Sequence, residues 1–282
     1  MRILLTGFTG RIGSYVLREL SSAGYHIRGL IEPGIGIPAG FSTLLNETIT
    51  GDIVDPVTWQ HAVQGVDAVV HLAAISGETP AAFETNVMSA RLLTQACQEA
   101  QVRSIVFASS NCVLGQCDRP GEPPYELESL PVDESHPLKP CADYGLSKLI
   151  GEHILHAAAR RWGIRVLALR PAMILLPEDI ENRMWTQFST AWHVSHLWAY
   201  LHVLDAARAF RLALEADSDG EFEAVYINAK DTVSDIPTPR LVERYYPKLL
   251  DDVKGLQEIE SLISAERANS LIGFEPRLSW RN

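Results

Sequence analysis

The first thirteen residues constrain the fold more than any other stretch of this chain. An apolar run after Arg2 leads into Gly7, Gly10 and Gly13, spaced three residues apart in the sequence RILLTGFTGRIG. This pattern is typical of a buried strand that turns into a helix, and glycines at such a turn let the backbone approach a ligand closely. The N-terminus of the following helix offers N–H groups and a partial positive charge to a pyrophosphate. The pattern therefore favours a dinucleotide site over a plain tight turn.

Length and charge narrow the classes of protein to consider. With 282 residues, 46% of them hydrophobic, the chain can bury a sizeable core and suits one large domain plus a small lobe. The 24 Lys and Arg residues against 35 Asp and Glu residues give a net charge of -11 without a basic cluster. This balance argues against nucleic acid and against an anionic membrane surface as partners.

Three further features bear on compartment and partners. The chain begins directly with strand residues, so we expect no signal segment and a cytoplasmic protein. Residues 184–204 carry no formal charge, but polar side chains interrupt them too often for a membrane span, and we expect a buried or ligand-facing segment. The four cysteines have neither a CxxC pair nor metal-like histidine spacing, which favours free thiols over disulfides or a metal site: Cys97, Cys112, Cys117 and Cys141.

Strand and helix patterns alternate over the first 170 residues. We expect strands at 2–6, 26–31, 48–50, 66–72 and 104–109. A first helical pattern runs through 15–20 and stops at Gly24, and Asp55 and Pro56 look like the cap and first position of a second helix, while longer helices are expected over 80–100 and 142–162. Residues 116–140 are rich in Pro, Gly and Glu and predict an exposed excursion. Repeated strand, helix and strand units imply a parallel sheet whose carboxyl ends form a ligand crevice.

The end of the second expected strand bears on the choice of dinucleotide. Glu32 lies one position beyond the usual place of the acidic residue that binds the adenosine ribose. No Lys or Arg occurs between Gly29 and Thr50, so only Arg11 or Arg28 is available for an NADP 2′-phosphate. NAD is therefore favoured, with NADP left open. Asp52 is equally well explained as a partner of the adenine amino group or as an ordinary loop aspartate.

A tyrosine and a lysine carry the chemistry that the sequence predicts. Tyr144 and Lys148 are four residues apart on an expected helix and therefore share one face. A nearby ammonium stabilises a phenolate, so Tyr144 can exchange a proton with a substrate whose oxygen Ser110 holds, while a nicotinamide exchanges hydride. This spacing also occurs by chance on many helices, and its weight comes from following a glycine turn and Ser109-Ser110 in this order.

At this point the chain resembles the extended short-chain dehydrogenase/reductase family, also called the NAD-dependent epimerase/dehydratase family, over about its first 230 residues. The resemblance implies a Rossmann-type doubly wound α/β fold with a small C-terminal substrate lobe. It implies Ser110, Tyr144 and Lys148 as the catalytic set, with Lys148 also gripping the nicotinamide ribose and Asp205 as a structural residue. The motifs that carry it are residues 6–13, 51–52, 71–74, 86–87, 109–115, 144–148, 170–171 and 202–205.

The resemblance also implies a set of cofactor-binding residues. A buried helix asparagine such as Asn86 is more often structural than catalytic, but the family pattern includes it. The implied cofactor contacts are Gly7, Thr9, Gly10, Arg11, Ile12, Glu32, Asp52, Ile53, Leu72, Ala73, Ala74, Asn86, Tyr144, Lys148 and Pro171.

Departures from the family pattern bear on the reaction type. The stretch Ser110-Asn111-Cys112 supplies no carboxyl group, which disfavours sugar dehydration. It looks like the corresponding stretch of uronate dehydrogenases and makes Asn111 a candidate substrate contact. Arg183-Met184 also looks like an Arg-Met pair of those enzymes, which makes Arg183 a candidate for binding a carboxylate or phosphate. The alternative is that Arg183 simply pairs with Glu178 or Asp179.

We therefore expect a dinucleotide-binding domain over 1–170, to which 201–230 return, and a substrate lobe made of 171–200 and 231–282. Aromatic residues of the lobe suit a ligand pocket, a lobe core or a dimer surface: Trp185, Phe188, Trp192, Trp198 and Tyr200. The long helices over 80–100 and 142–162 resemble those that pair in family homodimers. The expected activity is that of an oxidoreductase on a small polar, sugar-like substrate, with an epimerase or a non-catalytic dinucleotide-binding regulator as alternatives.

Overall fold

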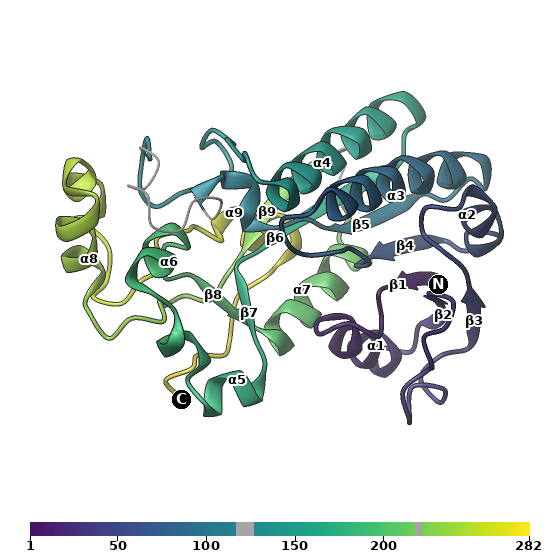
Figure 1. The fold of residues 1–282 in the computed structure, drawn as a ribbon, viewed down its shortest axis with the longest axis horizontal. Coiled ribbons are helices and arrows are strands. Elements are labelled where there is room, and N and C mark those ends of the chain that lie inside the picture. Colours follow the sequence, from purple (N-terminus) through teal and green to yellow (C-terminus); the bar gives the residue numbers. More distant parts are fainter. Residues whose placement is uncertain (117–126, 218–221) are drawn as a thin grey trace.

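The computed structural model describes residues 1–116, 127–217 and 222–282, and its centre is a seven-stranded parallel sheet (Figure 1). The strands lie in the order β3-β2-β1-β4-β5-β6-β9. They span Arg2–Thr6 (β1), His26–Ile31 (β2), Glu47–Thr50 (β3), Ala68–His71 (β4), Ser104–Ala108 (β5), Arg165–Pro171 (β6) and Phe222–Ile227 (β9). A separate parallel pair joins Met173–Leu175 (β7) to Tyr200–His202 (β8). The predicted doubly wound parallel sheet is thus confirmed.

Helices cover both faces of this sheet (Figure 1). One face carries Gly13–Ser22 (α1) and Val203–Glu215 (α7), and the other carries Pro56–Ala62 (α2), Pro80–Glu99 (α3) and Asp143–Trp162 (α4). The remaining helices are Pro177–Glu181 (α5), Thr190–Ser195 (α6), Thr238–Tyr245 (α8) and Glu266–Ile272 (α9), with 3-10 helices at Asn111–Leu114 (η1), Met184–Gln187 (η3) and Pro247–Val253 (η4). No helix in the described ranges is long and apolar enough to cross a membrane.

Local sequence explains where several of these helices begin and end. The Asp55 carboxylate accepts a hydrogen bond from the Val57 N–H, and Pro56 occupies the first helical position, so α2 starts there. Gly163 ends α4 in the left-handed conformation at φ +67°, which a glycine adopts without strain. Helix α1 turns Val16 and Leu20, four residues apart, toward the sheet.

Three groups of buried side chains hold the molecule together. One packs α1 and α7 onto the sheet and includes Phe274 beyond α9. The second lies between the sheet and α2, α3 and α4. The third lies outside the sheet among β7, β8, η3, α6, α8 and η4, and we call it the lobe core. The tail after residue 231 contributes to both the first group and the lobe core.

The expectation of an exposed excursion over 116–140 is wrong for several of the residues described there. Leu127, Leu130 and Val132 are buried in the lobe core, and Val132 exchanges backbone hydrogen bonds with Leu262 and Ser264. Apolar residues spaced between prolines and acids can pack against a distant segment, and that segment is not visible in local composition. Residues 117–126 lie outside the described residues.

The strand order reverses beside β1, and this reversal positions the candidate site. Strands β2 and β3 extend to one side of β1, while β4, β5, β6 and β9 extend to the other. Thr6 at the end of β1 pairs in register with His71 at the end of β4. The segments that follow these two strands therefore leave the sheet at the same level, where doubly wound sheets bind ligands.

Candidate active site

The glycine turn after β1 has a backbone that side chains would block. Gly7 has φ +68°, and a Cβ atom there would lie 2.6 Å from the backbone N of Ala73. A Cβ on Gly13 would lie 1.9 Å from the carbonyl oxygen of Gly7, so α1 packs directly on the turn. No side chain caps α1, and its first turn contains no acidic residue. The turn and the helix N-terminus therefore fit the pyrophosphate of a dinucleotide.

The same turn is tied to the segment that follows β4. The Thr6 Oγ1 accepts hydrogen bonds from the backbone N–H groups of Leu72 at 3.2 Å and Ala73 at 3.1 Å. Since both of these donors point to Thr6, its own hydroxyl hydrogen is available to Nδ1 of His71 at 2.8 Å. The other implied contacts of this region stand around it, with Thr9, Gly10, Arg11 and Ala74 exposed and Ile12 half-buried.

Asn86 joins this segment to the catalytic helix. Its amide group accepts from the Ile75 N–H and donates to the Ile75 carbonyl, both at 2.9 Å. It also donates to the hydroxyl of Ser147 at 3.0 Å, and that hydroxyl donates to the carbonyl of Tyr144. Asn86 thus has a positioning role, as expected of a buried helix asparagine. Ser147 had no distinguishing signal in the sequence.

Lys148 is the centre of the candidate catalytic set. It is buried, and its Nζ donates to the Ala108 carbonyl at the end of β5 at 2.8 Å. The same Nζ lies 5.7 Å from the ring centroid of the half-buried Tyr144, one turn earlier on α4. Ser110 follows Ala108 by two residues and caps η1, its hydroxyl accepting from the Cys112 N–H at 3.1 Å. Asn111 is buried beside it. The structure therefore brings Ser110, Tyr144 and Lys148 to one end of β5.

Burial controls the protonation of two groups near this set. It lowers the pKa of Lys148 to about 8, although the thiol of Cys112 and the carboxylate of Glu152 work in the opposite direction. Burial, with the charge of Lys148 adding to it, lowers the pKa of His71 to about 3. His71 is therefore a neutral hydrogen-bonding residue at physiological pH, and the positive charge of the site belongs to Lys148.

Arg11 and Arg28, the two cations considered for an NADP 2′-phosphate, both have partners. Glu32 is exposed directly after β2, one position beyond the usual place of the ribose-binding acidic residue. Arg28 is buried and binds Glu47 through Nε at 2.7 Å and two backbone carbonyls through Nη1. Arg11 binds Asp179. Asp52 is exposed and caps its own turn by accepting from the Val54 N–H, while Ile53 packs partly against the core.

The structure places Arg183 in the lobe, just before η3. It is exposed, has φ +45°, and its guanidinium lies 5.1 Å from the ring centroid of Trp280. The expected alternative partner Asp179 is taken by Arg11, which comes from the glycine turn. Within the described residues, Arg183 makes no contact with Tyr144 or Lys148. Pro171, an implied cofactor contact, is buried at the end of β6.

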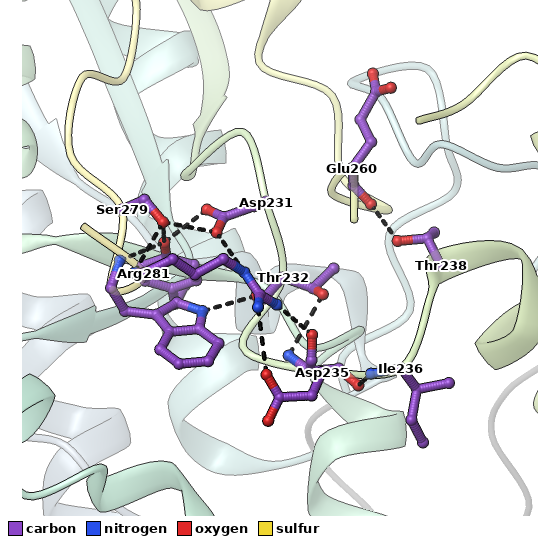
Figure 2. A network of polar contacts seen from close by, with 11 residues as sticks. Asp231, Thr232, Asp235, Ile236, Thr238, Glu260, Ser279 and Arg281 are labelled. Atoms are coloured by element: carbon purple, nitrogen blue, oxygen red, sulfur yellow. Dashed lines mark hydrogen bonds and ion pairs between the residues drawn. The ribbon is translucent and has the colours of Figure 1, made fainter. Parts of the chain in front are cut away.

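The C-terminal segment holds Trp280 in place. Figure 2 shows Arg281 reaching Thr232, Asp231 and Asp235, with its Nη1 3.2 Å from the Asp235 carboxylate. The indole of Trp280 donates to the Thr232 carbonyl at 2.9 Å and contacts the ring of Trp185. Trp185, Trp198 and Tyr200 are buried in the lobe core, whereas Phe188 and Trp192 are only half-buried. The lobe-core interpretation therefore holds for the first three aromatics.

Two hollows lie away from this set. One of about 1170 Å³ opens at the N-terminal ends of the strands, between Asp67, Arg103 and Arg165. The other, of about 640 Å³, lies beside α9 and is lined by Asn228 and Glu266 among others. Neither is lined by Ser110, Tyr144 or Lys148. Because parallel sheets bind ligands at the carboxyl ends of their strands, the glycine turn and the β5 end are the better candidate site.

Two dehydrogenases are among the known proteins that match this chain. A uronate dehydrogenase of Pseudomonas syringae pv. tomato is 31% identical over 194 residues, which cover 66% of this chain and 65% of that protein. The L-arabinose 1-dehydrogenase (NAD(P)(+)) of Haloferax volcanii is 28% identical over 239 residues, 82% of this chain and 89% of that protein. The matches span only about half of the curated UDP-glucose epimerases.

Solved structures share the fold. A short-chain dehydrogenase/reductase superfamily protein from Agrobacterium tumefaciens, solved with bound NAD, superposes with a TM-score of 0.72 at 25% identity, covering 100% of this chain and 94% of its own.

The family model described as the NAD dependent epimerase/dehydratase family matches residues 3–227, which include the glycine turn, the β5 end and α4. The chain therefore belongs to the NAD dependent epimerase/dehydratase family.

Proposed function

We propose that this chain is an NAD-dependent oxidoreductase that interconverts a hydroxyl and a carbonyl group on a small, polar, sugar-like substrate. One observation carries the proposal: the buried ammonium of Lys148 is hydrogen-bonded to the carbonyl of Ala108, two residues before Ser110, and lies 5.7 Å from the centroid of the Tyr144 ring. A lysine with only a structural role would destabilise the fold at this depth, because its ammonium group loses its hydration when it is buried.

The residues around the glycine turn would hold the dinucleotide. Gly7 and Gly13 leave room for a close approach, the N-terminus of α1 faces the pyrophosphate, and Glu32 suits the ribose hydroxyls. When bound, the nicotinamide supplies or takes up hydride at the substrate carbon. NAD is favoured over NADP because Glu32 would repel a 2′-phosphate and the buried Arg28 is already bound to Glu47.

The chain's own residues would handle the proton. The Ser110 hydroxyl holds the substrate oxygen, and the Tyr144 hydroxyl gives a proton to that oxygen or takes one from it. The Lys148 ammonium stabilises the tyrosinate, and its hydrogen bond to Ala108 keeps it in place. Asn86 and Ser147 fix the first turns of α4, which carry Tyr144.

The names of the relatives support a sugar-like substrate. Uronate dehydrogenases and an L-arabinose 1-dehydrogenase are among them. The stretch Ser110-Asn111-Cys112 contains no carboxyl group for a dehydration, so simple oxidation or reduction fits it better. Asn111 and Arg183 are the residues we propose as substrate contacts.

We further propose a cytoplasmic homodimer. The cysteine pattern, with the thiol of Cys97 free and buried, suits a reducing compartment. The long helices α3 and α4 lie side by side on one face of the sheet (Figure 1). They would pair with their counterparts across a two-fold axis.

The test is a set of titrations and a screen. Fluorescence titration with NADH and NADPH should show binding, with NADH the tighter ligand. A screen of aldoses, uronic acids and other polyols with NAD should then find a substrate with which the absorbance of NADH rises steadily. Failure of the intact protein to bind either dinucleotide would remove the proposal, and tighter NADPH binding would remove the cofactor preference.

The second candidate is an epimerase, because curated UDP-glucose 4-epimerases match the chain at 31% identity. An epimerase oxidises and re-reduces one carbon and has no need to release its cofactor. Mass spectrometry of the purified protein distinguishes the two: NAD retained at about one per chain favours the epimerase, and NAD-free protein with net NADH production favours the dehydrogenase.

A further inference from the structure

An ion pair joins the glycine turn to the lobe across 168 residues of sequence. The Nη2 of Arg11, which lies between Gly10 and Gly13, is 2.5 Å from Oδ2 of Asp179 on α5. Oppositely charged groups at this distance attract strongly where solvent is partly excluded. The dinucleotide cradle and the segment that leads to Arg183 are therefore in direct electrostatic contact.

The two partners differ in how firmly they are held. The Asp179 side chain is 12% exposed, and its Oδ2 also accepts from the Leu176 N–H at 2.9 Å, so it is fixed within the lobe. The Arg11 side chain is 58% exposed and lies on a turn with no side-chain cap. If another anion attracts the guanidinium, Arg11 is the partner that moves.

We propose that Asp179 competes with the dinucleotide for Arg11, so that cofactor binding releases α5 from the glycine turn. This inference rests on the proposed function, which supplies the anion. The pyrophosphate carries two negative charges and binds at the turn that contains Arg11, and a nearby carboxylate both repels it and occupies its nearest cation. Asp179 therefore lowers the affinity for the dinucleotide.

The competition couples the two halves of the site. By linkage, the free energy by which the Arg11 and Asp179 ion pair weakens dinucleotide binding equals the free energy by which the bound dinucleotide weakens that ion pair. Two residues separate α5 from η3, and Arg183 lies between them. Release of α5 would free the segment that carries the proposed substrate contact, so dinucleotide binding and the position of that segment are coupled.

The test measures NADH affinity of the full chain by fluorescence titration. Asp179→Asn removes the charge but keeps an acceptor for the Leu176 N–H, and it should lower the Kd for NADH about fivefold or more. Glu178→Gln is the matched control, because it removes the same charge from the adjacent, exposed position of α5, and it should change the Kd less than about twofold. If the asparagine variant does not fold, Asp179→Ser takes its place, since a hydroxyl can accept the same hydrogen bond.

Arg11→Met completes a double-mutant cycle. In the Arg11→Met background, Asp179→Asn should raise the NADH affinity much less than in the wild type, because its effect acts through Arg11. Equal Kd values for Asp179→Asn and Glu178→Gln, or an undiminished gain without Arg11, would overturn the inference and leave the proposed function standing. Weaker binding by Asp179→Asn would overturn it in favour of a strap that closes over the cofactor. A wild-type chain that binds no NADH would overturn the proposed function and this inference with it.

Discussion

Glu152 and Arg170 form a buried two-point ion pair behind the candidate active site. The Arg170 Nε lies 2.9 Å from Oε1 of Glu152, and its Nη2 lies 2.7 Å from Oε2. The hydroxyl of Ser109, next to Ser110, also donates to Oε1 at 2.6 Å. Since Glu152 is on α4 one turn after Lys148, this carboxylate ties the catalytic helix to the ends of β5 and β6. Only 6% of the Arg170 side chain and 4% of that of Glu152 are exposed.

Glu152→Gln should therefore destabilise the fold strongly. The change leaves the Arg170 guanidinium buried without the carboxylate that is hydrogen-bonded to it, and removal of one partner of a buried pair costs about 3–5 kcal/mol. Urea unfolding followed by circular dichroism measures this loss. Glu275→Gln is the control: its pair with Lys230 is more than 60% exposed at each side chain, so the expected loss is about 0–1 kcal/mol. Equal losses in the two variants would contradict the structural role of the buried pair.

Tyr144→Phe should slow the chemical step and leave dinucleotide binding nearly unchanged. The variant removes the hydroxyl that exchanges a proton with the substrate, a contribution of about two or more orders of magnitude, while keeping the ring above Lys148. Single-turnover measurement of NADH formation, with a substrate found in the screen, gives the rate. Tyr25→Phe is the control variant, because this tyrosine precedes β2 at the opposite end of the sheet from the glycine turn and its hydroxyl binds Glu215. A wild-type rate for Tyr144→Phe would exclude Tyr144 from the mechanism.

Local patterns predicted most of the sheet and its flanking helices. Strand β2 spans the expected residues 26–31, and α2 starts with the expected Asp55 cap. These features depend on residues within a few positions of one another, through apolar periodicity, proline and glycine. The same reasoning put Ser110 just after a strand and Tyr144 and Lys148 on one helix, and the structure has Ser110 after β5 and the other two on α4.

Long-range pairings had no comparable signal. Arg11 and Asp179 are each an ordinary charged residue in the sequence, and only the fold brings them together. Arg170 and Glu152 are recognisable as partners only after β6 and α4 are placed side by side. The aromatic residues of the lobe have the same composition whether they form a core or a pocket, and burial decides that Trp185 and Tyr200 belong to the core.

The free energy of unfolding should begin to fall as the pH drops below about 6.5, before the carboxylates titrate. Burial lowers the pKa of His71 to about 3 and that of His196 to about 4. Between pH 6.5 and these values the unfolded chain binds protons that the folded chain excludes, so this stability is present above pH 6.5 and is lost as the pH falls. For the fully buried His71 the loss is about 1.4 kcal/mol per pH unit.

Urea unfolding at pH 7, 6 and 5 measures this slope. His71→Asn should reduce the change of the unfolding free energy per pH unit by the contribution of one proton. His61→Asn, at an exposed position on α2, should leave that change as it is in the wild type. A free energy of unfolding that is constant from pH 7 to pH 5 would contradict the neutral state of His71.

Arg183→Met tests the proposed recognition of an anionic substrate. The guanidinium is exposed and lies 5.1 Å from the centroid of the Trp280 ring, so it is accessible to an anionic substrate. Loss of a charge-assisted hydrogen bond of about 1.5–3 kcal/mol should raise the KM for an acidic substrate about tenfold to a hundredfold, with the NADH Kd unchanged. Arg240→Met is the control, because that arginine is exposed on α8 and pairs with Glu243. A KM that Arg183→Met leaves unchanged, or a best substrate without an anionic group, would exclude Arg183 as the recognising cation.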